Sequence, residues 1–327
     1  MKMFNSMLFI FSGILFFSST SLFAKDAWEN ARFKTRNSAE GHDGRVTAIA
    51  SDKDGKSFFS CGSDGYVVRW SENGNGDRYQ LSSYPLSSIT VNPAGTDFAV
   101  WESEGTDSNV ITVFDWNSQT KKFSKRFSDK ITGLSYSQKG SYLFISTQGV
   151  SSYYILDSKN GTILKKISDI SSPICMIKTG ASEKSAVFYL KSGMIVYYNL
   201  VNFGSFKKFS TEGNLYQTTL FSGNKYLAGE KNGFIYIIDA LTGKNLSRIP
   251  SKSPTILEDS ESSDILYYLE KDAKGTTSLK SINADDSFSA ETAGTVSISS
   301  GEAIASAART LKDVIIGTTS GNIYSDR

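Results

Sequence analysis

The stretch GHDGRVTAIASDKDGKSFFSCGSDGYVVRW, residues Gly41–Trp70, decides how the rest of the chain is interpreted. It holds three short runs rich in β-branched and aromatic residues, VTAIASD, SFFSCGS and YVVRW, separated by polar and glycine-containing turns. Such runs predict strands joined by tight turns. The stretch also holds the single histidine of the chain, His42, and one of its two cysteines, Cys61. It is therefore either a chemical site or one unit of a repeat.

A regular period along the chain favours the repeat. Strands end in a polar corner and are followed by strands carrying basic residues, and the corners lie at Trp70, Asp115, Asp157, Asn199, Asp239 and Asn283. Their spacings are 45, 42, 42, 40 and 44 residues, the range for a four-stranded propeller blade. The turns DKDGK, NPAGT and SQKGS recur at the first hairpin of three units, where Gly55, Gly95 and Gly140 supply the positive φ that such turns need. Only GEAIASAART, residues 301–310, leaves helix and strand undecided.

The two ends of the chain predict a closed ring. The last repeat reaches its polar corner at Asp326, 43 residues after Asn283, and so lacks an outer strand. The segment before the first inner strand occupies the place of an outer strand, so we predict that Ala31 to Asn37 completes the last blade and leaves no open sheet edge. The predicted fold is an all-β propeller of seven four-stranded antiparallel blades. The predicted blades span residues 44–85, 86–129, 130–169, 170–213, 214–252, 253–294, and 295–327 plus 25–43.

The opening stretch resembles the WD40 repeat. Gly41-His42 stands where that family has Gly-His, SDKDGKSF where it has a Ser-Pro-Asp-Gly-like hairpin, and Trp70 where it has the tryptophan of Trp-Asp. The resemblance implies a structural hydrogen-bonded tetrad of His42, Ser60, Asp64 and Trp70, in which the carboxylate orients the imidazole, and the hydroxyl meets the imidazole and accepts the indole N–H. The match is firm over one blade, since the second unit has Asp115-Trp116 in reverse order. A pyrroloquinoline-quinone-like or other bacterial envelope propeller class stays open.

The same residues could be taken for chemistry, and we favour the structural interpretation. A Ser/His/Asp set suggests acyl transfer, but the tetrad order ties Ser60 to an indole and no Gly-x-Ser-x-Gly turn is present. The run Asp52-x-Asp54-Gly55 is similar to the start of a calcium loop but lacks the following glutamate. We therefore predict no catalytic, metal-binding or cofactor-binding residues, and a protein that is not an enzyme.

The first 24 residues have the layout of a secretory signal peptide. Lys2 precedes an apolar run from Met7 to Phe17, small polar residues follow, and cleavage is expected after Ala24. The propeller domain then spans residues 25–327 and is exported, periplasmic or secreted, without stable membrane insertion after cleavage. An uncleaved N-terminal anchor is the minor alternative.

The charge of the chain bears on the class of partner, and its cysteines bear on whether a disulfide forms. Lys+Arg 35 against Asp+Glu 33 gives a net charge of +2, which offers no reason to expect nucleic acid. Cys61 and Cys175 fall in non-adjacent units, so we expect no disulfide and two thiols in strand cores. Dibasic pairs recur at the start of outer strands, at Lys121-Lys122, Lys165-Lys166 and Lys207-Lys208. We interpret them first as edge-strand protection and second as a basic rim for acidic lipids or an acidic partner.

Two functions from different classes fit these features. The first is a non-catalytic scaffold in the cell envelope that binds another protein through its loops and channel mouth. The second is a propeller enzyme, quinone-enzyme-like or hydrolase-like, or a small-molecule or glycan binder, acting in the central channel. Acidic and aromatic residues converging there would favour the second, whereas a mouth lined by Ser, Thr and Lys would disfavour it. The sequence does not place the loop residues Glu102, Glu104, Asp107, Glu230 and Lys231.

Overall fold

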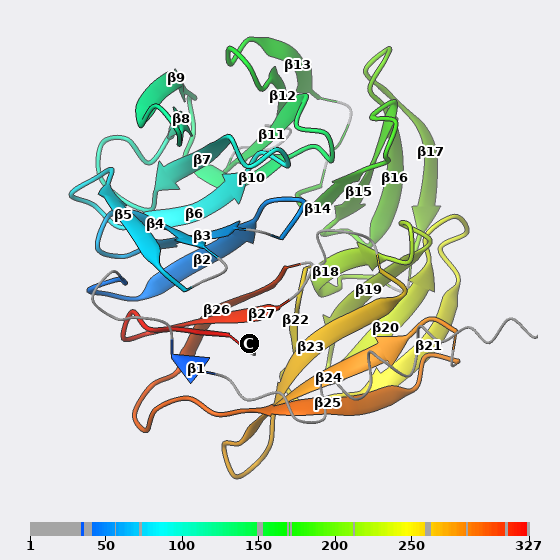
Figure 1. Cartoon of the computed structure of the whole chain (residues 1–327). Coiled ribbons are helices and arrows are strands. Elements are labelled where there is room, and N and C mark those ends of the chain that lie inside the picture. Colours follow the sequence, from blue (N-terminus) through cyan, green and yellow to red (C-terminus); the bar gives the residue numbers. More distant parts are fainter. Residues whose placement is uncertain are drawn as a thin grey trace, which may run out of the picture.

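The computed structural model describes residues 34–35, 41–55, 57–71, 74–148, 153–168, 170, 172–211, 213–258, 263–285, 287–310 and 313–325. In these ranges every regular element is a β-strand, and the strands form seven four-stranded antiparallel sheets arranged around a central axis (Figure 1). The predicted all-β propeller with seven four-stranded blades is confirmed.

Each blade runs from an inner strand at the axis to an outer strand at the rim. The inner strands are β2 (Val46–Ser51), β6 (Leu86–Val91), β10 (Ile131–Tyr136), β14 (Ile174–Thr179), β18 (Tyr216–Phe221), β22 (Thr255–Ile256) and β26 (Ile304–Arg309). The second strands are β3 (Ser57–Gly62), β7 (Asp97–Glu102), β11 (Tyr142–Thr147), β15 (Ser185–Leu190), β19 (Tyr226–Lys231), β23 (Ile265–Lys271) and β27 (Val314–Thr318). The third strands are β4 (Tyr66–Ser71), β8 (Val110–Asp115), β12 (Tyr153–Asp157), β16 (Met194–Asn199), β20 (Phe234–Asp239), β24 (Thr277–Asn283) and β28 (Ile323–Ser325). The outer strands are β5 (Gly76–Gln80), β9 (Thr120–Arg126), β13 (Ile163–Ile167), β17 (Gly204–Ser210), β21 (Asn245–Pro250), β25 (Ala290–Val296) and, in the seventh blade, β1 (Lys34–Thr35).

The seventh blade joins the two ends of the chain, as predicted. β1 pairs antiparallel with β28, with Lys34 opposite Ser325 and Thr35 opposite Tyr324. The remainder of the predicted closing segment, Asp326 and the predicted signal peptide lie outside the described residues. The undecided segment at residues 301–310 contains β26, so it contributes the inner strand of this blade.

The polar corners that revealed the period are turns between the third and fourth strands. In five of the six, all but the one at Trp70, an Asp or Asn side chain accepts a hydrogen bond from a backbone N–H two or three residues later, an arrangement that favours a tight turn. These bonds are Asp115 to Ser118 at 2.9 Å, Asp157 to Lys159 at 2.8 Å, Asn199 to Val201 at 2.7 Å, Asp239 to Leu241 at 2.9 Å and Asn283 to Asp285 at 3.0 Å. The period of the sequence is thus a period of side-chain-capped turns.

A bulge near the start of the inner strand corrects the prediction for Cys175. In six of the seven described pairings between first and second strands, the register shifts close to the start of the inner strand. In β14 the shift lies between Ile174 and Met176, at Cys175. An extra residue at a bulge leaves the regular alternation of faces, and Cys175 is exposed rather than in a strand core. Cys61 is buried, and the two thiols form no disulfide.

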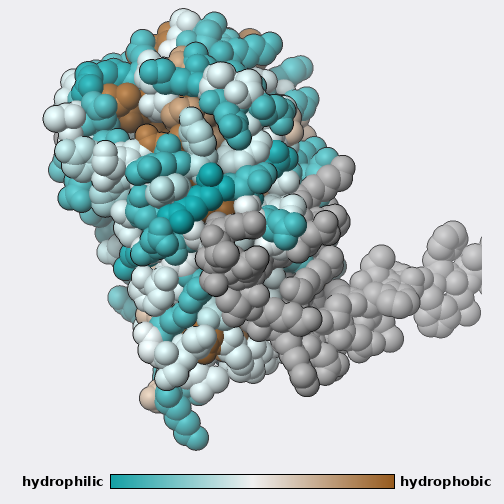
Figure 2. Space-filling view, turned by 60° about the vertical axis from the view of Figure 1, so that its left-hand side comes forward, coloured by the Kyte–Doolittle hydropathy of each residue, from teal (hydrophilic) through white to brown (hydrophobic). Residues whose placement is uncertain are grey.

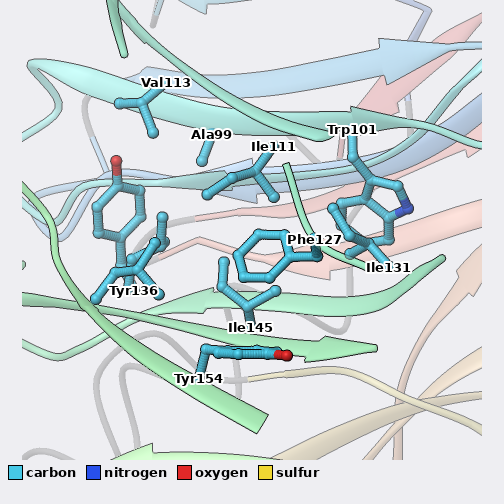
Figure 3. Close-up of a cluster of buried hydrophobic side chains, with 11 residues drawn as sticks. Ala99, Trp101, Ile111, Val113, Phe127, Ile131, Tyr136, Ile145 and Tyr154 are labelled. Carbon is cyan, nitrogen blue, oxygen red and sulfur yellow. The ribbon is translucent and has the colours of Figure 1, made fainter. Parts of the chain in front are cut away.

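The core consists of apolar clusters between neighbouring blades. Figure 3 shows one of them, where Ile111 and Phe127 of the second blade meet Ile145 and Tyr154 of the third. Burying a large apolar side chain completely contributes about 1.5–3 kcal/mol. The cluster at the ring closure, between the first and seventh blades, comprises Val46, Phe58, Val68, Trp70, Ile315 and Ile323.

Candidate functional site

The four residues of the predicted tetrad lie in one hydrogen-bonded chain in the first blade. His42 precedes β2, Ser60 lies in β3, Asp64 in the turn after β3, and Trp70 in β4. His42 Nδ1 is 3.0 Å from Asp64 Oδ1, and His42 Nε2 is 2.8 Å from Ser60 Oγ. The indole N–H of Trp70 donates to Ser60 Oγ at 2.8 Å. Since the indole nitrogen is only a donor, Ser60 is left to donate to His42 and His42 to Asp64.

Asp64 is the charged end of this chain. Burial alone would raise the pKa of its carboxyl group, but the hydrogen bonds from His42 and from the backbone N–H groups of Asp43 and Tyr66 outweigh burial, and the pKa is lowered. The Asp43 N–H donates to Oδ2 at 3.0 Å and the Tyr66 N–H to Oδ1 at 3.2 Å. The carboxylate therefore holds both the imidazole and the backbone of the turn.

Two residues that sequence reasoning missed complete the site. Gly62 lies beside the imidazole, where a Cβ would come within 2.6 Å of both His42 Nδ1 and Asp64 Oδ1, so only glycine fits without a shift. Arg78 of β5 donates to Asp64 Oδ2 at 3.3 Å and to Asp43 Oδ2 at 2.5 Å, and its guanidinium lies 3.7 Å from the centre of the Tyr66 ring. The Gly-Ser-Asp-Gly order after Cys61 was the available signal for Gly62, whereas nothing local marked Arg78.

The Ser/His/Asp distances are those of a hydrolytic triad, but the surroundings are different. Ser60 is 0% exposed, and its Oγ accepts the Trp70 N–H. A serine nucleophile needs access to a carbonyl carbon and an oxyanion hole beside it. In this position Ser60 can stabilise the blade but cannot reach a substrate.

The axial channel is the second candidate site. It encloses a cavity of about 430 Å³. Its wall combines small and hydroxyl-bearing residues of several inner strands with apolar ones. The small and hydroxyl-bearing residues include Ala48, Ala50, Ser51, Ser88, Thr90, Gly133, Ser135, Thr179, Thr218 and Ala308, and the apolar ones include Ile49, Ile89, Leu134, Ile174, Met176 and Ile177. Cys175 also lines the cavity, and partial burial raises the pKa of its thiol.

The charged residues of the channel come from four blades. Lys178 of β14 forms an ion pair of 2.6 Å with Glu258, which follows β22. Arg309 of β26 donates to Ser263 Oγ at 2.8 Å and lies over the Tyr267 ring at 4.4 Å. Lys53, in the β2–β3 hairpin, also lines the cavity. Glu258 is the one carboxylate among the described lining residues.

The loop residues that the sequence could not place do not line the channel in the described structure. Glu102 accepts a hydrogen bond from Ser82 at 2.6 Å, and Asp107 forms an ion pair with Arg126 at 2.6 Å. Both lie in a separate cavity of about 450 Å³ beside the outer strands of the second blade. Glu230 accepts the Gly233 N–H at 3.1 Å and supports the β19–β20 turn.

One lysine of each dibasic pair has a defined neighbour. Lys122 forms an ion pair of 3.4 Å with Asp97, a buried carboxylate that also accepts the Tyr136 hydroxyl at 3.0 Å. Lys166 lies over the Tyr154 ring at 5.5 Å and Lys207 over the Phe209 ring at 4.6 Å. These lysines therefore pack against their own or neighbouring strands.

Among the residues that the structure describes, no group of three or more His, Cys, Asp or Glu side chains is arranged to hold a metal ion. Within the same ranges there is no helix with the length and apolarity needed to span a bilayer.

Comparison with known proteins places the chain in a family. An uncharacterized protein of Treponema pallidum (strain Nichols) is 25% identical over 211 residues, which cover 64% of this chain and 34% of the relative. The chain therefore matches about a third of the relative's length. A family described as an N-terminal beta-propeller domain matches residues 24–326, almost the whole chain. With its seven blades closed into a ring, the chain belongs to this family of N-terminal β-propeller domains.

Proposed function

We propose that the protein is an exported, WD40-like propeller that acts as a non-catalytic scaffold for another protein in the cell envelope. Export is supported by the lysine, apolar run and small residues of positions 1–24. The WD40-like character is supported by the hydrogen-bonded chain through His42, Ser60 and Trp70.

The observation that carries the proposal is the character of the channel. Ala, Ser, Thr and Gly line much of the wall beside apolar residues such as Ile49, Leu134 and Met176, and its one described carboxylate, Glu258, is paired with Lys178. The single histidine is held between Ser60 and Asp64. An enzyme needs positioned acids, bases or nucleophiles in contact with substrate. A rigid ring with variable turns suits recognition instead.

A second candidate function is the binding of a small anionic molecule in the channel. It is favoured by the cavity of about 430 Å³ and by Lys53, Lys178 and Arg309, which line it. Equilibrium dialysis with small carboxylates and sugar acids tests it. Binding that disappears in Lys53→Gln would support this function, and identical binding by the variant would refute it.

The scaffold proposal is tested by crosslinking in the native envelope, purification through a tag, and mass spectrometry. A stoichiometric protein partner is the expected result, and repeated absence of any partner under gentle conditions would refute the proposal. Export is tested by sequencing the N-terminus of the protein from fractionated cells. We expect the chain to begin at or near Lys25, and an intact Met1 in the cytoplasm would contradict export.

A further inference from the structure

Exposed apolar side chains gather at the rim where the fourth and fifth blades meet. Val201 is 72% exposed, Phe206 59%, Leu241 53% and Leu246 40%. Val201 and Leu241 lie in the turns between third and outer strands, and Phe206 and Leu246 lie on the outer strands β17 and β21. We call these four residues the rim patch. By contrast, the flank turned forward in Figure 2 is mainly hydrophilic, with apolar residues in small separate spots.

Contacts across the blade boundary connect the two halves of the rim patch. The Tyr197 ring of β16 meets the Phe206 ring edge-on at 6.0 Å, and its hydroxyl donates to the Ala240 carbonyl at 3.1 Å. Leu241 is the next residue of that turn. Tyr197 thus links the blade-four side of the patch to the blade-five side.

Arg248 of β21 faces the same boundary. It pairs with Tyr236 in the strand register and lies over the Phe234 and Tyr236 rings at 3.6 and 5.7 Å. Leu246 stands two residues earlier, where the β20–β21 register shifts, and is 40% exposed. Tyr236 packs in the cluster between the fourth and fifth blades, together with Tyr197. The rim patch therefore has exposed apolar residues on both sides of the boundary between two blades, whereas single exposed apolar residues are the norm on a soluble protein.

Positive charges predominate on the strands and turns that carry this surface. Residues 194–210 and 234–250, which form β16, β17, β20, β21 and their turns, contain Lys207, Lys208, Lys244 and Arg248 against a single carboxylate, Asp239. Asp239 accepts a hydrogen bond from the Leu241 N–H, so its carboxylate caps the turn that follows β20. Since the whole chain has a net charge of only +2, the excess is local. It favours an acidic partner.

We propose that the rim patch docks a segment of the partner protein in which apolar side chains are flanked by carboxylates. This inference rests on the proposed scaffold function and assigns its surface. Tyrosine and arginine side chains fixed at the centre of an apolar surface are typical of protein interfaces. Because Arg248 stacks on aromatic rings, its planar guanidinium is held in one orientation, in which its N–H groups can donate hydrogen bonds to the carboxylates of a partner. A second copy of the chain would bring the same cations together across a two-fold interface, which is unfavourable.

The test uses the purified full chain and three synthetic peptides of equal length as probes. One combines Leu with Glu, one Leu with Lys, and one Ser with Glu, and binding is followed by fluorescence anisotropy. We expect the Leu/Glu peptide to bind at least about tenfold more tightly than either other peptide, because it offers both apolar and charge complementarity. The paired variant Phe206→Ser with Leu246→Ser should lose at least about tenfold in affinity for it.

The control variant is Ile163→Ser with Leu164→Ser on β13, where both side chains are also partly exposed, at 38% and 39%. It should bind within about twofold of the parent protein. If the rim variant fails to fold, Val201→Ser with Leu241→Ser, at the turn apices, repeats the measurement. Equal binding by parent and rim variant, or binding of the Leu/Lys peptide as tight as that of the Leu/Glu peptide, would overturn the proposal.

Two further results would also overturn it. These are flotation with anionic phospholipid vesicles that the rim variant loses, and a dimer in sedimentation that the rim variant abolishes. The envelope crosslinking experiment separates this proposal from the scaffold function. A partner captured equally by the parent and the rim variant would leave the scaffold function intact and refute only the assigned surface.

Discussion

Replacing Trp70 tests the tetrad and the ring closure together. The side chain is 1% exposed, stacks on Phe58 at 5.9 Å between ring centroids, and packs against Ile315 and Ile323 of the seventh blade. Trp70→Ala should lower the free energy of unfolding by about 3–5 kcal/mol through the cavity and the lost donor to Ser60. Trp70→Phe keeps an aromatic ring in place and loses the N–H, so it should cost about 1–2 kcal/mol.

The assay is urea unfolding of the purified chain followed by far-UV circular dichroism at neutral pH. The midpoints should fall in the order parent, Trp70→Phe, Trp70→Ala, with a slope close to that of the parent. Val201→Ala, at a 72% exposed position, is the control and should leave the midpoint unchanged. Parent-like stability of Trp70→Ala would refute the packing argument. Equal losses in the two Trp70 variants would refute the division between ring volume and hydrogen bond.

Three other predictions follow from described contacts. Because the pKa of Asp64 is lowered in the folded state, its stabilisation is present above the ordinary aspartate pKa of about 3.9 and lost as pH falls through the folded-state value. Asp64→Asn should therefore cost about 1–2 kcal/mol at neutral pH, and a cost that does not shrink in acid urea titrations would contradict this. Deleting residues 31–37 should uncover the edge of β28 and cause aggregation or a lower midpoint, whereas parent-like melting would exclude closure by β1. Burial raises the pKa of Cys61 to about 12, so a thiol reagent should label Cys175 alone in the native protein and both cysteines in denaturant, and rapid native labelling of Cys61 would be inconsistent with its burial.

The fold was predictable because its turns repeat at the level of side-chain chemistry. Asp115, Asp157 and Asp239 each cap the turn that follows their strand, and Asn199 and Asn283 do the same, so a local requirement marks five of the seven units. The last repeat supplies only three strands of a four-stranded blade. The sequence therefore also predicted that the fourth strand of that blade comes from another part of the chain. β1 lies inside the predicted segment from Ala31 to Asn37.

The unpredicted features depend on contacts between units. Cys175 is exposed because β14 bulges there, and a bulge depends on pairing with β15 rather than on the residues of one strand. Arg78 reaches Asp64 from the outer strand of its blade, a contact that no short motif encodes. The rim patch combines Phe206 and Leu246, 40 residues apart and on different blades, so only the assembled ring brings them to one surface.

The pairing of β1 with β28 also dictates when folding can finish. Lys34 and Ser325 lie about 290 residues apart in the chain, so the contact that seals the ring is among the most distant the sequence allows. Six blades can assemble in order as the chain emerges, since each is built from consecutive strands. The side chain of Trp70 is fully buried only after Ile315 and Ile323 of the last blade have packed against it. During synthesis the growing chain is therefore an open arc whose first and last blades lack a packing partner, and chaperones and proteases can act on that arc before the ring closes.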